Sequence, residues 1–240
     1  MKAAAVFLML SVGACDSIPS SAPSTSDASA RSEDFPKAAR PVSSIVSDRW
    51  STEEARDRVN EADVVMSIAG ITPGMTVADI GAGEGYYTIR LAERVGASGR
   101  VLAQDIFPAV RDKLAERVTR YNLDNVSVKL GLPADPKLPN NSFDRIFMVH
   151  MYHEISDPFE FLWRLRPALR VGGRVIIVDA KRPTSSHGTP PALLDCEMKA
   201  VGYRRVDFQD MPKIGGYLAA FEASGKRPEP GRIRPCRQDG

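Results

Sequence analysis

Short apolar runs alternate with amphipathic stretches along most of the chain. Five runs too short for helices are expected to form strands, at 76–80, 100–105, 126–130, 143–149 and 174–179. Between these strands, helices are expected at about 85–96, 108–121 and 158–170. Strands that are apolar on both faces and separated by helices are typical of a parallel sheet that is covered on both sides.

Two further strands are expected near the end of the chain, at 203–208 and 216–223, with a short loop between them. Parallel neighbours require a crossover of about a dozen residues, so this pair is expected to be antiparallel. The predicted fold class is therefore α/β: a Rossmann-like, doubly wound, seven-stranded sheet, mostly parallel, with an antiparallel C-terminal hairpin. Before the sheet, a capping-box spacing from Ser51 to Glu54 and the helical apolar spacing over 55–69 predict one long helix.

The first fifteen residues, MKAAAVFLMLSVGAC, combine one basic residue, a short apolar stretch and a cysteine. This is the shape of a secretory signal, and it is too short to span a membrane. Its end, VGAC, resembles the bacterial lipobox, which predicts a signal peptide over 1–14 and a lipidated Cys15. The alternative is a cytosolic start that happens to be apolar, with Cys15 an ordinary cysteine.

The remaining chain divides by composition. Residues 16–34 are mostly Ser, Ala, Pro and Asp, with one isoleucine and no aromatic residue. Such a segment buries too little apolar area to offset its ordering entropy, so a flexible tether is expected over 15–47. A globular domain is expected over 48–225, followed by an irregular tail rich in Pro and Arg over 226–240.

Charge and length exclude several classes of protein. The 32 Lys and Arg nearly balance the 30 Asp and Glu, so the charge gives no sign of a nucleic-acid partner. No apolar run reaches the roughly 18 residues of a membrane-spanning helix. In an oxidising compartment Cys196 and Cys236 could pair and pin the tail.

The stretch VADIGAGEGYYT, residues 77–88, carries the strongest chemical signal. Gly81, Gly83 and Gly85 follow the first strand and open a helix, which leaves bare backbone where a ligand approaches. A nucleoside triphosphate turn would continue with a lysine, and a dinucleotide turn would have the spacing G-x-G-x-x-G. Asp79 would repel a pyrophosphate, but it suits the cationic sulfonium and ammonium groups of S-adenosylmethionine.

Asp105 ends the next strand and is expected to accept hydrogen bonds from both ribose hydroxyls, with Ile106 beside the adenine. In this order, VADIGAGEGYYT, GRVLAQDI, NVSVKLGLPADPKLPNNSFDRIFMVHMYHEI and GGRVIIVDA resemble the motifs of class I S-adenosylmethionine-dependent methyltransferases. The resemblance covers residues 50–223 and is greatest to the small-molecule enzymes related to quinone C-methyltransferases.

The resemblance implies functions for individual residues. The methionine end of the cofactor is expected at Asp79, Gly81, Gly83 and Gly85, and the ribose at Asp105. Asp135, in the loop after the third strand, matches the carboxylate on the adenine side, although many relatives place that residue nearer Gly131.

The fourth strand ends in HMYHE, which carries His150, Tyr152, His153 and Glu154. Methyl transfer needs positioning and, for a protonated acceptor, a base. His153 is the expected base, with Tyr152 and Glu154 as further catalytic candidates, whereas His150 is expected to pack or to contact the cofactor. No metal site is expected, because H-x-x-H-E at a strand end lacks the helix that would align its ligands. Asp179, which ends the fifth strand, faces the crevice or serves an ordinary turn.

These residues predict an S-adenosylmethionine-dependent methyltransferase that acts on a small molecule, whose identity the sequence leaves open. The alternative is a binding lipoprotein without turnover on the same fold, while the glycine spacing and Asp79 disfavour an NAD oxidoreductase. The N-terminus predicts a lipid-anchored protein at the periplasmic face of a bacterial membrane. The cytoplasmic origin of the cofactor makes a cytoplasmic location the alternative, and the oligomeric state stays open.

Overall fold

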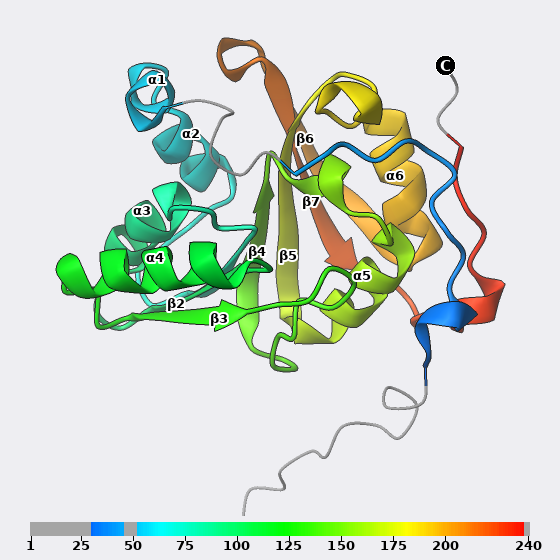
Figure 1. Cartoon of the computed structure of the whole chain (residues 1–240), viewed down its shortest axis with the longest axis horizontal. Coiled ribbons are helices and arrows are strands. Elements are labelled where there is room, and N and C mark those ends of the chain that lie inside the picture. Colours follow the sequence, from blue (N-terminus) through cyan, green and yellow to red (C-terminus); the bar gives the residue numbers. More distant parts are fainter. Residues whose placement is uncertain (1–29, 46–51, 238–240) are drawn as a thin grey trace, which may run out of the picture. The chain divides into compact units, whose positions relative to one another are not determined.

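A seven-stranded sheet in the order β3-β2-β1-β4-β5-β7-β6 forms the centre of the chain (Figure 1). This computed structural model describes residues 30–45 and 52–237, so the predicted signal peptide over 1–14 and Cys15 lie outside the described residues. The strands are β1 (Thr76–Ile80), β2 (Arg100–Asp105), β3 (Val126–Leu130), β4 (Phe143–Val149), β5 (Leu169–Ala180), β6 (Tyr203–Met211) and β7 (Gly216–Ala223). β7 lies antiparallel to both β5 and β6, and all other neighbours are parallel, which confirms the predicted fold class.

Helices cover both faces of the sheet. They are α1 (Glu53–Arg58), α2 (Glu61–Ile68), α3 (Tyr86–Val95), α4 (Pro108–Arg120), α5 (Pro158–Leu165) and α6 (Pro191–Ala200). Right-handed crossovers between parallel strands place α3 and α4 on one face and α5 and α6 on the other. Among the described residues, none of these helices has the length and apolar character that crossing a bilayer requires.

The long helix predicted before the sheet is two short helices. Asn60 separates α1 from α2 and adopts a left-handed φ of 55°. Thr52 caps α1, one residue after the predicted cap, and its hydroxyl accepts a hydrogen bond from the Ala55 N–H at 3.3 Å. Asn tolerates the left-handed conformation better than most residues, so Asn60 can end one helix and begin the next. The apolar spacing continues through this break and therefore could not reveal it.

Two other boundaries differ from the sequence prediction. The helix predicted over 158–170 ends at Leu165, and Leu169 already begins β5. The sequence analysis missed α6, which starts at the second residue of the pair Pro190-Pro191. Proline is favoured at the first position of a helix, so that pair was the available signal.

Residues 31–45 are packed against the domain, which corrects the predicted tether over 15–47. Phe35 is buried, and its ring lies 5.4 Å from that of Trp163 in an edge-on arrangement. The composition argument fails here because a few anchoring side chains attach this segment, whatever its average hydrophobicity. The rest of the predicted tether lies outside the described residues.

A buried ion pair is a second anchor of this segment. Arg40 donates from Nε to Oε1 of Glu197 on α6 at 2.9 Å, and both side chains have 0% exposure. Farther along the segment, the Ser43 hydroxyl donates to the carbonyl of Thr184, after β5. In Figure 1 this segment (blue) runs beside α6 and the C-terminal tail (red).

The tail over 226–240 is irregular as predicted, and it is also packed. Ile233 and Cys236 are buried, and a disulfide joins Cys236 to Cys196 on α6. The carbonyl of Pro228 accepts a hydrogen bond from the Trp163 indole at 2.8 Å. The pairing proposed from the sequence is therefore present and fastens the tail to a helix of the domain.

Candidate functional site

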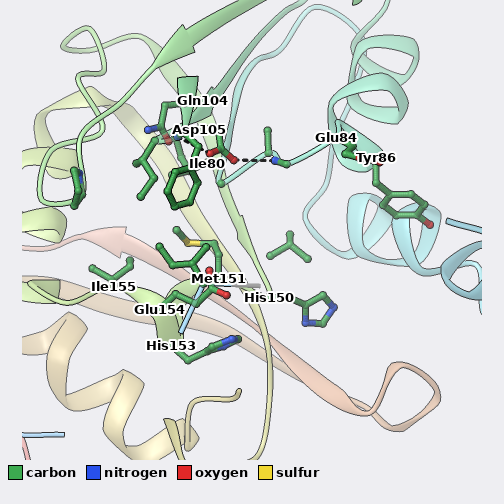
Figure 2. Close-up of a pocket in the computed structure, with 18 of the residues that line it drawn as sticks. Ile80, Glu84, Tyr86, Gln104, Asp105, His150, Met151, His153, Glu154 and Ile155 are labelled. Carbon is green, nitrogen blue, oxygen red and sulfur yellow. Dashed lines mark hydrogen bonds between the residues drawn. The ribbon is translucent and has the colours of Figure 1, made fainter. Parts of the chain in front are cut away.

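A cavity of about 790 Å³ lies at the carboxyl ends of β1, β2 and β4. Its walls come from the glycine turn after β1, the end of β2, the segment that follows β4, and α1. Strand order reverses between β1 and β4, where doubly wound sheets bind their ligands. Cavities of about 300–1,000 Å³ hold small ligands. In Figure 2, Asp105 and Gln104 lie on one side of this cavity and His153 and Glu154 on another, with Met151 between them.

The three glycines of the turn have different functions. Gly81 and Gly83 line the cavity with left-handed φ angles of 67° and 55°. Gly85 does not line it, which corrects its prediction as a cofactor residue. A Cβ on Gly85 would lie 2.5 Å from Cδ1 of Leu114 on α4, so glycine is required there for helix packing. Gly81 and Gly83 thus supply the bare backbone for a ligand.

Asp105 ties the glycine turn to the end of β2. Its Oδ2 accepts from the Gly83 N–H at 3.1 Å, and its Oδ1 accepts from the Phe107 N–H at 3.0 Å. Ile106 lines the cavity beside it. The carboxylate therefore lies at the cavity wall in a fixed orientation, as a ligand for ribose hydroxyls requires.

Asp79 lies behind the turn and not at the cavity wall. It is 3% exposed, and its Oδ2 accepts from the Thr88 hydroxyl at 2.6 Å. Burial raises the pKa of Asp79 to about 6, and the Thr88 hydrogen bond opposes this shift. Its charge can act on a ligand only through space.

Asp135 is also absent from the cavity, which corrects its prediction as the adenine-side carboxylate. Its Oδ1 accepts from the Lys137 N–H at 2.8 Å, and its Oδ2 lies 3.0 Å from the Lys137 ammonium. The carboxylate therefore stabilises its own turn. Pro133 of the same loop lines the cavity instead.

Gln104 and Arg56 are among the cavity residues that could not be found from the sequence. Gln104 is 1% exposed, and its Nε2 has no hydrogen-bond partner among the described residues. A Cβ on Gly131 would collide with this amide, so the glycine makes room for it. Arg56 of α1 also lines the cavity, with its guanidinium 3.9 Å from the centre of the Tyr86 ring. Gln and Arg occur on many strands and helices, so nothing in the sequence marks these two as cavity residues. Only the fold shows where they lie.

His153 lies at the other end of the cavity, in a turn of 3₁₀ helix, and is 1% exposed. Its Nδ1 is 3.0 Å from Oδ1 and 3.1 Å from Oδ2 of Asp179. Asp179 also accepts from the Ala180 N–H at 2.8 Å and the Thr189 hydroxyl at 2.7 Å. Because every neighbour of this carboxylate donates, we assign the proton to Nδ1 and the lone pair to Nε2 of His153.

Tyr152 is turned away from the cavity, which corrects its prediction as a catalytic residue. It is 0% exposed, and its hydroxyl donates to Oε2 of Glu197 at 2.7 Å. Burial, together with the charge of Glu197, raises the pKa of Tyr152 well above its ordinary value. Tyr152 is therefore part of the buried network around Arg40.

His150 joins a second network at the cavity wall. It has a left-handed φ of 55°, and its Nε2 lies 3.4 Å from Oε1 of Glu61. The same oxygen accepts from Arg56 at 2.7 Å and from the Tyr87 hydroxyl at 3.1 Å. Burial raises the pKa of Glu61, but hydrogen bonds from His150 and Arg56 outweigh it and lower the pKa to about 2.

The structure thus separates the predicted site residues into two groups. Those that line the cavity are Gly81, Gly83, Asp105, Ile106, His153 and Glu154. Those that do not are Asp79, Gly85, Asp135 and Tyr152. The hydrogen bond from the Gly83 N–H to Asp105 was not predicted from the sequence, and the functions expected of Asp105 and His153 stay predictions.

Residues 77–173 match the methyltransferase domain family. The chain is 34% identical over 192 residues to the ubiquinone/menaquinone biosynthesis C-methyltransferase UbiE of Idiomarina loihiensis. This match covers 63% of this chain and 74% of that protein. It is 30% identical over 137 residues to the arsenite methyltransferase of Halobacterium salinarum, where the match covers 54% of this chain and only 34% of that protein.

Among solved structures, the SAM-dependent methyltransferase of Aquifex aeolicus superposes with a TM-score of 0.64 at 26% identity, over 70% of this chain and 91% of that one. The [4+2]-cyclase SpnF shares the fold alone, with a TM-score of 0.60 at 18% identity over 74% of this chain and 84% of that one. The family match and these two methyltransferase relatives show that the chain belongs to the S-adenosylmethionine-dependent methyltransferases.

Proposed function

We propose that this chain transfers the methyl group of S-adenosylmethionine to a small, largely apolar acceptor. The observation that carries the proposal is that one cavity connects the cofactor turn with the His153–Asp179 pair. At one end Gly81, Gly83 and Asp105 hold the cofactor. At the other end an oriented imidazole faces the space that remains.

Bound at Gly81, Gly83 and Asp105, S-adenosylmethionine would supply an electrophilic methyl group on a sulfonium, with a neutral thioether as the leaving group. Asp105 orients the ribose through both carboxylate oxygens. Asp179 fixes the tautomer of His153, and the Nε2 lone pair takes the proton that a hydroxyl, amine or activated carbon must lose. Glu154, beside His153 at the cavity wall, is proposed to orient the acceptor.

The walls of the cavity support an apolar acceptor. Its apolar side chains away from Asp105 include Val149, Met151, Ile155 and Phe161. A flat ring with one ionisable group fits such a wall and a single base. Several relatives are named as methyltransferases of ubiquinone, menaquinone or demethylmenaquinone, and the reduced form of such a ring carries ionisable hydroxyl groups.

The test measures binding and turnover separately. Calorimetry of the full chain is expected to detect S-adenosylmethionine and S-adenosylhomocysteine but not NAD. Gly83→Leu fills the space of the ligand, so affinity is expected to fall at least about 100-fold, or about 2.7 kcal/mol. Gly172→Ala is the matched control, since Gly172 also has a positive φ and nothing lies within 4 Å of its Cβ position.

Turnover is followed as tritium transferred from labelled cofactor to a panel of hydroquinones, phenols and amines. A methylated hydroquinone would support the proposed acceptor class. Cofactor binding without transfer to any acceptor in cell extract would instead favour the binding protein without turnover. Unchanged affinity in Gly83→Leu would overturn the placement of the cofactor.

For the location of the protein, we propose an exported, lipid-anchored form with Cys15 as its acylated residue. The lipobox-like VGAC supports this proposal, and so does the disulfide Cys196–Cys236, because disulfides persist in oxidising compartments. Cells are labelled with a radioactive fatty acid and fractionated. Wild type is expected to carry label and to sediment with membranes, and Cys15→Ala to do neither. A soluble, unlabelled wild type would establish the cytoplasmic alternative.

A further inference from the structure

Two histidines and a glutamate converge beside the acceptor end of the cavity. His153, Glu154 and His187 each bring one ring nitrogen or carboxylate oxygen, and these three atoms all lie within 4.8 Å of one another. The two imidazole rings are nearly perpendicular, with centroids 5.6 Å apart. We propose that these three side chains bind a divalent transition-metal cation, of the type of Zn²⁺ or Co²⁺.

The distances are close to those of a formed site. Bonds of about 2.0–2.2 Å to Zn²⁺ place tetrahedral ligand atoms roughly 3.4 Å apart. Atoms within 4.8 Å therefore need to approach by about 1.4 Å at most to form such a site. Two imidazoles with one carboxylate are a ligand set of catalytic zinc and of other first-row metals.

The first histidine has the outer contact that metal-binding histidines usually have. Nδ1 of His153 faces the carboxylate of Asp179 at 3.0 and 3.1 Å, so in the proposed site Nε2 is the metal ligand. A carboxylate behind a histidine fixes its tautomer and raises its basicity toward a metal. The further hydrogen bonds from Ala180 and Thr189 hold Asp179 in this position.

The N-terminal segment positions both histidines. The His187 N–H donates to Oγ of Ser43 at 3.3 Å, and the Ser43 N–H donates to the carbonyl of His153 at 3.2 Å. His187 adopts a left-handed φ of 53°, which is costly for a residue of this type. One residue of the packed segment thus joins two turns that are far apart in sequence.

This ligand set differs from the one that the sequence motif offers. The spacing H-x-x-H-E pairs His153 with His150, but the structure directs His150 to Glu61 and brings His187 in its place. His153 and Glu154 line the cavity, so the remaining coordination position opens toward it. A water or an oxygen of the acceptor would complete the shell there.

A bound cation would also change methyl transfer, and this consequence rests on the proposed function. The cation takes the same Nε2 lone pair of His153 that removes the proton from the acceptor. Turnover is therefore expected to fall as the site fills and to return when a chelator removes the metal. The site would make the enzyme sensitive to free transition metals.

The first test is metal binding to the full chain, without any acceptor. Titration with Co²⁺ is expected to give one equivalent and the visible absorption of a low-symmetry site, and Zn²⁺ is expected to displace it. His187→Asn and Glu154→Gln are each expected to weaken binding at least about 100-fold, and Asp179→Asn about 10–100-fold. His150→Asn is the matched control, because His150 is the one remaining histidine of the sequence and lies outside the cluster. The metal affinity of this variant is expected to stay within about twofold of wild type.

Two results would overturn the site: wild type that takes up less than about a tenth of an equivalent of Co²⁺, or binding that His187→Asn and Glu154→Gln leave unchanged while His150→Asn removes it. Circular dichroism of each variant shows that loss of binding is not loss of fold. Activity separates the two proposals. A metal that binds and raises turnover would leave the site standing and overturn His153 as the base, whereas a folded protein that binds no metal would leave the base proposal untouched.

Discussion

The cofactor end of the cavity and the histidine end are built from different amounts of chain. The first uses the turn after β1 and the end of β2, where one carboxylate, Asp105, accepts from backbone N–H groups, and both parts come from a single β–α–β unit. The second joins His153 to Asp179, Thr189 and Ser43, which come from three other parts of the chain. Under the proposed function, a cofactor shared by a whole family is held by one β–α–β unit, whereas the acceptor is bound by residues that only tertiary structure brings together. Four predictions test this division.

The largest effect is expected from His153→Ala, at the histidine end. Loss of the base is expected to lower turnover about 10²–10⁴-fold, because proton transfer by a positioned side chain contributes that much. The affinity for S-adenosylhomocysteine is expected to stay within about twofold, since His153 belongs to the other end. An equal loss of cofactor affinity would show that the two ends are one functional unit, and full activity would remove His153 from the mechanism.

The second effect concerns the anchor behind the histidine end. Arg40→Ala leaves Glu197 buried without its cation, and the loss of one partner of a buried ion pair costs about 3–5 kcal/mol. Urea unfolding is expected to show a loss of this size in the free energy of unfolding. In the double variant Arg40→Met/Glu197→Leu the loss is expected to be smaller, because no charge stays buried. A loss below about 1 kcal/mol in Arg40→Ala would mean that the segment over 31–45 does not stabilise the domain.

The third effect is a dependence of stability on pH at the cofactor end. The pKa of Asp79 is about 6 in the fold and 3.8 when unperturbed, a difference worth about 3 kcal/mol. Between these pKa values the folded protein holds more protons than the unfolded chain. Stability is therefore fully present below about pH 4 and falls as pH rises to about 6. Asp79→Asn is expected to remove about 2–3 kcal/mol of this fall, measured as free energies of unfolding at pH 4 and pH 7. Parallel pH profiles of variant and wild type would contradict it.

The smallest effect is expected from Asp105→Ala. Removing hydrogen bonds to a charged group is expected to weaken cofactor binding by about 1.5–3 kcal/mol, measured by calorimetry with S-adenosylhomocysteine. Asp112→Ala is the matched control, because Asp112 is an exposed carboxylate nearby on α4. Turnover at saturating cofactor is expected to change little. A tenfold loss of turnover at saturation would extend the function of Asp105 beyond binding.

The same division explains what could be predicted from the sequence. The seven strands, their mostly parallel arrangement and the glycine turn were predictable because apolar period, spacing and one short motif encode them, whereas the strand order was not predicted. The pairing of His153 with Asp179 was not, because nothing in the chain marks which strand end faces which turn. Asp135 and Tyr152 have the right residue type near the right position, but they are turned to Lys137 and Glu197 by local contacts that spacing does not record. Residues 31–45 escaped prediction because their anchors are few and their partners distant.

Helix α6 carries two neighbouring fasteners, Cys196 for the C-terminal tail and Glu197 for the N-terminal segment. Ala39 and Arg237 also form a parallel bridge, so these two parts of the chain lie against each other as well. The N-terminal segment and the C-terminal tail are therefore attached to the same turn of α6, and the N-terminal segment also brings Ser43 into contact with the turns that carry His153 and His187. Reduction of the Cys196–Cys236 disulfide is expected to loosen the C-terminal tail and, through the bridge between Ala39 and Arg237, the N-terminal segment that carries Ser43. The redox state of the surroundings is therefore expected to affect both the stability of the domain and the positions of the two histidines.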